Sequence, residues 1–121
     1  MITSRIDRIT AIEPDRLRTD APIPRSVKIE LTGRCNFKCS FCARSMKLRD
    51  QQDMDEGLFK RLVSEMRAAG VEELGLFYLG ESMLVPWLPR AVSYAKNVGY
   101  PYVFLTTNAS LATPTRLRRI F

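Results

Sequence analysis

The sequence predicts an α/β fold built from parallel βα units, and three observations support this prediction. Segments with strand-like and helix-like patterns alternate three times along the chain, with the strand first each time. The middle strand-like segment, 74–79, is an almost continuous apolar run, which is typical of a strand buried on both faces of a parallel sheet. The helix-like segments have the apolar periodicity of amphipathic helices. Right-handed crossovers through these helices would place the strands side by side in one sheet.

The first βα unit begins with a short strand. Residues 27–31 alternate apolar and polar side chains, which predicts a strand, and a loop that contains all the cysteines follows it. The next segment predicts a helix in which Asp53 is the N-cap, Glu56 stands at the capping-box spacing and Gly70 ends the last turn. We expect the apolar stripe of this helix to be core packing; it consists of Met54, Leu58, Phe59, Leu62, Val63 and Met66.

The second unit contains the buried strand 74–79, which is bounded by Gly80. A helix is predicted over 87–98, because Pro89 lies near its first turn, apolar residues recur at helical spacing, and Gly99 terminates it. This unit therefore repeats the order of the first.

The third unit begins with a strand over 102–106. Thr113 and Pro114 are typical of a helix start, so the last helix is predicted from Thr115 onward. The chain ends inside this apolar and basic helix, at Phe121, without a C-cap or a polar tail, and we expect it to be a piece of a longer protein.

Length and composition are those of one globular domain. The chain has 121 residues, of which 45% are hydrophobic and 26% charged, and this excludes disordered, collagen-like and low-complexity classes. Residues 1–24 end in Ala-Pro-Ile-Pro and predict an N-terminal arm ahead of a domain over 25–121. The longest apolar run is far shorter than the roughly 20 residues of a membrane span, and the N-terminus has no apolar signal core. We therefore expect a soluble, cytoplasmic chain with no membrane partner.

The cysteines and the missing histidines restrict the chemistry. The chain has three cysteines within eight residues, Cys35, Cys39 and Cys42, and a disulfide framework would leave one thiol over. Clustered thiols in a reducing compartment indicate a metal site. Because the chain has no histidine, Ser-His-Asp, Cys-His and Cys2His2 sites are excluded.

Basic residues surround the cysteines. The chain has 19 Lys and Arg against 13 Asp and Glu, and five of the basic residues flank the cysteines with no acid among them: Arg34, Lys38, Arg44, Lys47 and Arg49. This local charge indicates an anionic ligand. Nucleic acid is the alternative, but the patch lacks interleaved aromatic residues and coincides with a metal motif, so we do not expect a nucleic-acid partner.

The spacing of the cysteines, three residues and then two, suits an iron-sulfur cluster. Three thiolates on one short loop can hold three corners of a cuboidal cluster, and the chain has no further Cys or His for the fourth iron. An open coordination position is where an external molecule binds and is activated. A structural zinc site would need a fourth ligand, normally Cys or His. The alternative is a non-catalytic iron-sulfur electron carrier, which would cap all four irons with protein.

The C-x3-C-x2-C motif, with the aromatic Phe41 before its last cysteine, resembles the signature of the radical S-adenosylmethionine enzymes. The segment PRSVKIELTGRCNFKCSFC, which leads into the cysteines and contains them, is similar to the first strand and loop of that family. The resemblance implies that residues 25–121 are the N-terminal half of a partial (βα)6 TIM-like barrel.

The resemblance also implies two cofactors, a 4Fe-4S cluster and S-adenosylmethionine. In that family the open iron chelates the amino and carboxylate groups of S-adenosylmethionine, whose reductive cleavage gives a 5′-deoxyadenosyl radical that abstracts hydrogen from a substrate. It implies a small-molecule or peptide substrate and an external electron donor such as flavodoxin or ferredoxin. We assign no catalytic side chain from the sequence.

Two more motifs resemble motifs of that family, and this resemblance implies particular cofactor-binding residues. Leu79-Gly80-Glu81-Ser82 resembles the family's Gly-Gly-Glu-Pro, which implies that Gly80 and Glu81 receive the methionine ammonium. The backbone of Phe41 would contact adenine. Thr106-Thr107-Asn108-Ala109 resembles the family's Thr-Asn-Gly and adds Asn108, although asparagine is also an ordinary turn former. Alanine in place of the last glycine weakens the case that this turn needs a left-handed residue. The two motifs favour the branch with a C-terminal auxiliary-cluster (SPASM/twitch) domain.

Overall fold

The structure is a computed structural model, which describes residues 6, 11, 21–46 and 51–121. Most of the predicted N-terminal arm, residues 1–24, lies outside the described residues. Residues 21–24 of this arm are described; they are exposed and lie just before the first strand.

The described residues contain a three-stranded parallel sheet with strand order β1-β2-β3. The strands are β1 (Ser26–Lys28), β2 (Glu73–Gly75) and β3 (Tyr102–Phe104), and both neighbouring pairs are parallel. The predicted α/β fold with parallel βα units is therefore confirmed. The strands are shorter than the predicted ones, because the chain leaves the sheet and enters a loop soon after the last paired residue of each strand. Backbone hydrogen bonds from Ile29 to Gly75 and from Leu76 to Phe104 extend the pairing by one residue.

Helix α2 (Glu56–Ala68) follows the cysteine loop and covers the sheet. Its N-cap is Asp55, whose carboxylate accepts a hydrogen bond from the Leu58 N–H at 2.8 Å. The prediction of Asp53 as the N-cap is thus wrong by two residues, because Asp53 binds residues of the loop base instead. Gly70 has φ of 104° and terminates the helix as predicted.

The other two α-helices begin and end close to the predicted residues. Helix α3 (Leu88–Asn97) is followed by Gly99 with φ of 93°, and helix α4 (Pro114–Ile120) is capped by the Thr113 side chain. Two short 3-10 helices were not predicted: η2 (Ala43–Met46), within the cysteine loop, and η3 (Ser82–Leu84), after β2.

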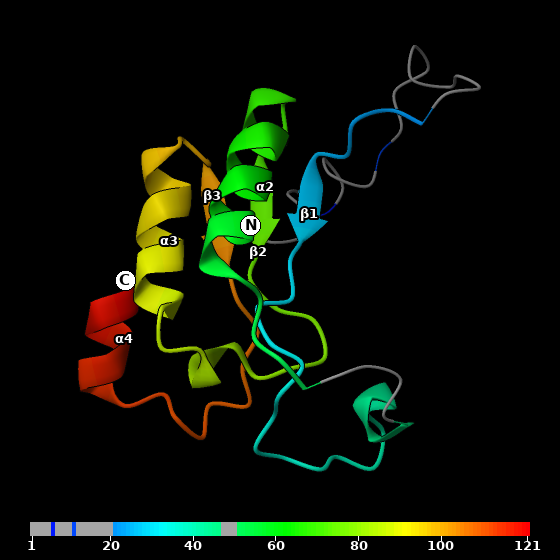
Figure 1. Ribbon diagram of the computed structural model, residues 1–121, viewed down its shortest axis with the longest axis vertical. Helices are drawn as coiled ribbons and strands as arrows, with labels where there is room; N and C mark the ends of the chain where they lie inside the picture. The colour runs from blue at the N-terminus through cyan, green and yellow to red at the C-terminus, as the bar shows by residue number, and fades with distance from the viewer. Residues whose placement is uncertain (1–5, 7–10, 12–20, 47–50) are drawn as a thin grey trace.

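The hydrophobic core lies between the sheet and the helices. Figure 1 shows α2 and α3 side by side on the viewer's side of the strands, and the loops that follow β1 and β2 beyond their arrowheads. The largest fully buried apolar side chains are Leu31, Phe59, Val63, Val71, Leu74, Leu76, Met83, Val85 and Leu88. Because they come from the first two βα units and from the segments that follow β1 and β2, the core fixes where the loops at the carboxyl ends of these strands begin. Within the described part of the chain, no helix combines the length and apolarity that crossing a bilayer requires.

An ion-pair cluster links α2 to α3. The Glu56 carboxylate lies 2.7 Å from Arg90 Nη2 and 3.1 Å from Lys60 Nζ. Hydrogen bonds from these two cations lower the pKa of Glu56 from 4.5 to about 2. Because the pKa is depressed in the folded state, the carboxylate stabilises the protein fully above the unfolded pKa and loses this contribution as the pH falls through the folded pKa.

We expect the Tm of Glu56→Gln to be slightly lower than that of the parent at about pH 6. At about pH 2 the two Tm values should be nearly equal, because the parent carboxylate is also losing its charge there. Thermal unfolding followed by circular dichroism at several pH values measures this difference. Glu65→Gln, an exposed position on the same helix, is the matched control. A Tm difference for Glu56→Gln that stays constant down to pH 2 would contradict the assignment of the ion pairs.

Candidate functional site

The candidate site lies at the carboxyl ends of the three parallel strands. Each strand is followed by a loop that carries predicted site residues: the cysteine loop after β1, Gly80 and Glu81 after β2, and Asn108 after β3. In parallel α/β sheets this end is where ligands bind. The structure brings the three loops into direct contact through side-chain hydrogen bonds.

The base of the cysteine loop is closed by a bidentate ion pair. Arg34 donates from Nε and Nη2 to the two oxygens of Asp53 at 2.9 and 2.7 Å, and the Thr32 hydroxyl donates to Asp53 Oδ1 at 2.6 Å. Backbone hydrogen bonds from Gly33 to Gln52 and from Met54 to Leu31 lie beside it. Paired hydrogen bonds of this kind are geometrically specific, so the two ends of the cysteine loop are held in one register.

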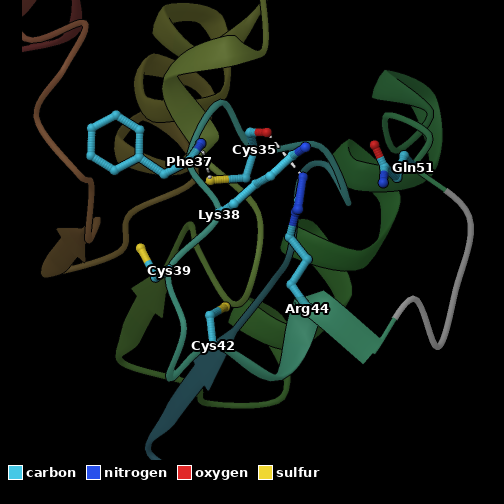
Figure 2. A pocket seen from close by; sticks show the side chains of 7 residues that line it. All are labelled: Cys35, Phe37, Lys38, Cys39, Cys42, Arg44 and Gln51. Atoms are coloured by element: carbon cyan, nitrogen blue, oxygen red, sulfur yellow. Dashed lines mark hydrogen bonds between the residues drawn. The ribbon is translucent and has the colours of Figure 1, made fainter.

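Cys35, Cys39 and Cys42 line one open cavity of about 530 Å³. All three residues are half-buried, and no disulfide joins them. Figure 2 shows the three cysteines following one another along the same stretch of loop, with Cys39 between Cys35 and Cys42 in this view. The structure therefore brings the three predicted metal ligands together at one site.

The donor set, three thiols on one short loop, fits an iron-sulfur cluster. Among the described residues, no group of three His, Cys, Asp or Glu side chains is arranged to hold one ion. A cluster gives each thiolate its own iron, so its ligands stand farther apart than those of a single ion. Three thiols that line one cavity are the ligands that such a cluster would take from this loop.

Positive charge on the cavity wall also fits an anionic group. Lys38 and Arg44 line the cavity together with the cysteines (Figure 2). Arg44 Nη2 donates to the Cys35 carbonyl at 2.9 Å, which holds the guanidinium beside the loop. Its Nε is buried and has no hydrogen-bond partner among the described residues. A buried donor without a partner next to three thiols is suited to a bound anion.

Gly80 lies where two backbones approach closely. A Cβ at this position would lie 1.8 Å from the Thr32 carbonyl oxygen and 3.0 Å from the Arg34 carbonyl oxygen. The Glu30 carboxylate accepts hydrogen bonds from the backbone N–H groups of Leu79 and Gly80 at 2.8 and 2.9 Å. Glu30 thus joins the end of β1 to the loop after β2, and only glycine fits at position 80.

Glu81 is buried, and its carboxylate joins the loop after β2 to the loop after β3. Oε1 accepts from the Met83 N–H and the Thr107 hydroxyl, both at 2.9 Å, and Oε2 accepts from the Asn108 N–H at 2.8 Å. The contact with the methionine ammonium, implied by the family resemblance, stays a prediction. A carboxylate has about four acceptor positions, so three hydrogen bonds leave room for one more donor.

Asn108 contacts the cysteine loop directly. Its Nδ2 lies 2.9 Å from Asn36 Oδ1 and 3.9 Å from Cys35 Sγ, while its Oδ1 accepts from the Ser110 N–H, which is an Asx turn. Ala109 has φ of 61°, so the turn does contain a left-handed residue although alanine replaces the usual glycine. Hydrogen bonds to Glu81 and within the turn hold the alanine in this conformation.

Phe41 lies between Cys39 and Cys42, and its side chain is 90% exposed. The side chain does not join the hydrogen-bonded contacts of the other predicted residues. The predicted adenine contact concerns the backbone of Phe41 and stays a prediction.

Several residues that build the site were not predicted from the sequence: Glu30, Thr32, Asn36, Asp53 and Ser110. Glu30 occupies an ordinary polar position in an alternating strand, and nothing local distinguishes it. The sequence Asn-Ala-Ser at 108–110 does contain a signal, since asparagine commonly accepts a hydrogen bond from the backbone two residues on.

Comparison with known families gives a match over most of the chain. A family model described as the Radical SAM superfamily matches residues 29–121. This range includes all three cysteines and the loops after β2 and β3.

Individual relatives agree with the family match. The chain is 32% identical over 97 residues to the PqqA peptide cyclase of Xanthomonas oryzae pv. oryzae, covering 79% of this chain and 26% of the relative. It is 30% identical over 91 residues to the S-adenosylmethionine-dependent nucleotide dehydratase of Lacinutrix mariniflava, covering 71% of this chain and 19% of the relative. The chain thus spans about a quarter of the length of the curated relatives it matches.

A solved structure supports the fold. The crystal structure of BtrN in complex with AdoMet and 2-DOIA matches with a TM-score of 0.73 at 22% identity, covering 79% of this chain and 40% of BtrN. At this identity the likeness shows the fold alone. The family model, which covers the strand ends and the three cysteines, shows more: the chain belongs to the radical SAM superfamily.

Proposed function

We propose that this chain binds a 4Fe-4S cluster and S-adenosylmethionine, and that it forms part of an enzyme that cleaves S-adenosylmethionine reductively. The observation that carries the proposal is the cavity lined by Cys35, Cys39 and Cys42 at the carboxyl end of a parallel sheet. Three thiolates leave one iron of a cuboidal cluster without a protein ligand from this loop. Membership of the family supports the same cofactors.

When bound, the cluster would supply the electron that splits S-adenosylmethionine into methionine and a 5′-deoxyadenosyl radical, which takes a hydrogen atom from the substrate. The chain's own residues would bind and orient the cluster and S-adenosylmethionine. Cys35, Cys39 and Cys42 would ligate three irons, while Lys38 and Arg44 offset the negative charge of the site.

The loop after β2 would hold the amino-acid end of S-adenosylmethionine. Gly80 permits close backbone approach, and Glu81 keeps a carboxylate at the strand ends, 2.8–2.9 Å from its three donors. Its negative charge and its remaining acceptor position suit an ammonium group. The backbone of Phe41 would lie along the adenine.

The names of the relatives support a proposal for the substrate class. Several are named PqqA peptide cyclase, and another is a probable GTP 3′,8-cyclase of Methanothermobacter marburgensis, 28% identical over 71% of this chain. We therefore propose a peptide or a small molecule as substrate and an external flavodoxin or ferredoxin as electron donor.

The test is electron paramagnetic resonance of the anaerobically reconstituted, dithionite-reduced 121-residue chain with and without S-adenosylmethionine. We expect S-adenosylmethionine to change the g-values of the reduced cluster, because it would coordinate the open iron. 5′-Methylthioadenosine, which lacks the amino and carboxylate groups that would chelate the open iron, is the matched control ligand and should leave the g-values unchanged. We expect little or no reductive cleavage by the 121-residue chain alone.

An unchanged spectrum would contradict the proposal and favour the alternative, a non-catalytic iron-sulfur electron carrier. A nucleic-acid-binding role for the basic residues predicts a different result: DNA or RNA affinity that falls steeply with salt and survives replacement of all three cysteines.

A further inference from the structure

One side chain of the loop after β3, that of Asn108, reaches a candidate cluster ligand. Its Nδ2 lies 3.9 Å from Cys35 Sγ and 2.9 Å from Asn36 Oδ1. An amide NH2 group has two hydrogens, so it can donate one to each acceptor. The contact brings a donor from a distant part of the sequence to a cysteine sulfur.

The orientation of the Asn108 amide follows from its neighbours. The backbone N–H of Ser110 can only donate, and it lies 3.0 Å from Asn108 Oδ1. The amide oxygen therefore faces Ser110, and the NH2 group faces Cys35. In the flipped orientation the Ser110 N–H would face another donor.

Three side chains form a closed ring of hydrogen bonds around this contact. Asn108 Nδ2 donates to Asn36 Oδ1 at 2.9 Å, Asn36 Nδ2 donates to Ser110 Oγ at 2.8 Å, and Ser110 Oγ donates to Asn108 Oδ1 at 2.7 Å. Each donor meets one acceptor, and hydrogen bonds connected in this way strengthen one another. The ring uses one hydrogen of the Asn108 amide and leaves the second for Cys35 Sγ.

The backbone around Asn108 is held as firmly as its side chain. Its N–H donates to Glu81 Oε2 at 2.8 Å, and the next residue, Ala109, is left-handed with φ of 61°. A left-handed alanine is strained and persists only where its surroundings hold it. The structure thus places the Asn108 amide by a buried carboxylate, a strained turn and a side-chain ring together.

We infer that Asn108 donates a hydrogen bond to the Cys35 sulfur when this thiolate ligates the cluster, and that Asn36 and Ser110 are positioning residues for it. The inference rests on the proposed function, because it requires a cluster. Hydrogen bonds to the sulfurs stabilise the added negative charge of the reduced cluster and raise its potential. The Phe37 N–H, 3.4 Å from the same sulfur, is a second donor. This role differs from the contact with S-adenosylmethionine that the family resemblance implies for Asn108.

The test is a redox titration of the reconstituted 121-residue chain, followed by electron paramagnetic resonance, on the parent, Asn108→Ala and Ser110→Ala chains. We expect Asn108→Ala to keep its iron and sulfide and to move the midpoint potential to a more negative value. Ser110→Ala should move it in the same direction by less, because the donor remains but loses one support. Thr106→Ala, an exposed position in the same loop, should leave it unchanged.

The outcomes separate this inference from the proposed function. A parent chain without a cluster would refute both, whereas an intact cluster with an unchanged midpoint potential in Asn108→Ala would overturn the inference alone. If Asn108→Ala binds less iron, Ser110→Ala decides: a more negative potential supports the inference, and an unchanged potential overturns it.

Discussion

Gly80→Ala is expected to destabilise the protein by about 3 kcal/mol or more, because the new methyl group has no space. Its Cβ would lie 1.8 Å from the Thr32 carbonyl oxygen, and the obstacle is backbone, which cannot rotate away as a side chain can. Relieving the clash would separate the two loops and break the 2.8 Å hydrogen bond from the Glu81 N–H to the Arg34 carbonyl. Thermal unfolding should show a Tm lower by about 10 °C or more.

Gly70→Ala is the matched control for this prediction. A Cβ at Gly70 meets no atom within 4 Å, and only its left-handed backbone, with φ of 104°, opposes the change. The control therefore carries the conformational cost alone, about 1–2 kcal/mol. If Gly80→Ala unfolds no more easily than Gly70→Ala, the close approach of the two loops is not present in solution.

Single replacement of Cys35, Cys39 or Cys42 by Ala is expected to abolish the cluster. We expect the reconstituted parent chain to hold about four irons and a similar amount of sulfide, with the three thiolates as ligands. The three thiols line one cavity, and each would serve a different iron, so the loss of any one leaves a second iron exposed. Iron and sulfide assays with the visible absorption spectrum measure the loss.

Ser40→Ala changes an exposed residue of the same loop and should keep the full iron content. The variant in which all three cysteines are replaced is the decisive case. If it retained iron and sulfide after desalting, the cluster would lie elsewhere in the chain.

The parts of the fold that depend on local sequence were predicted well. Gly70 and Gly99 end their helices in the left-handed conformation, and the Thr113 side chain caps α4, because each of these rules involves residues within one turn. The choice between Asp53 and Asp55 as the N-cap of α2 is different. Both aspartates suit a cap, and contacts of Asp53 with Thr32 and Arg34, far away in sequence, decide between them.

The site was predictable only where chemistry restricts the residue type. Thiols at a fixed spacing identified the cysteine loop, whereas Glu30 and Asn36 are polar residues whose importance arises from partners some 50 to 70 positions away. Ala109 shows the converse. Its local preference is against a left-handed backbone, and the hydrogen bonds around Asn108 override that preference.

The loops at the strand ends are linked pairwise into a closed circuit, which limits how they can move. Glu30 ties the first loop to the second, Glu81 ties the second to the third, and the pair of Asn36 and Asn108 ties the third back to the first. A loop held at two points has no hinge of its own, so displacing any one of them strains both others. We therefore expect opening at this end of the sheet to involve all three loops together, rather than as three independent loop fluctuations.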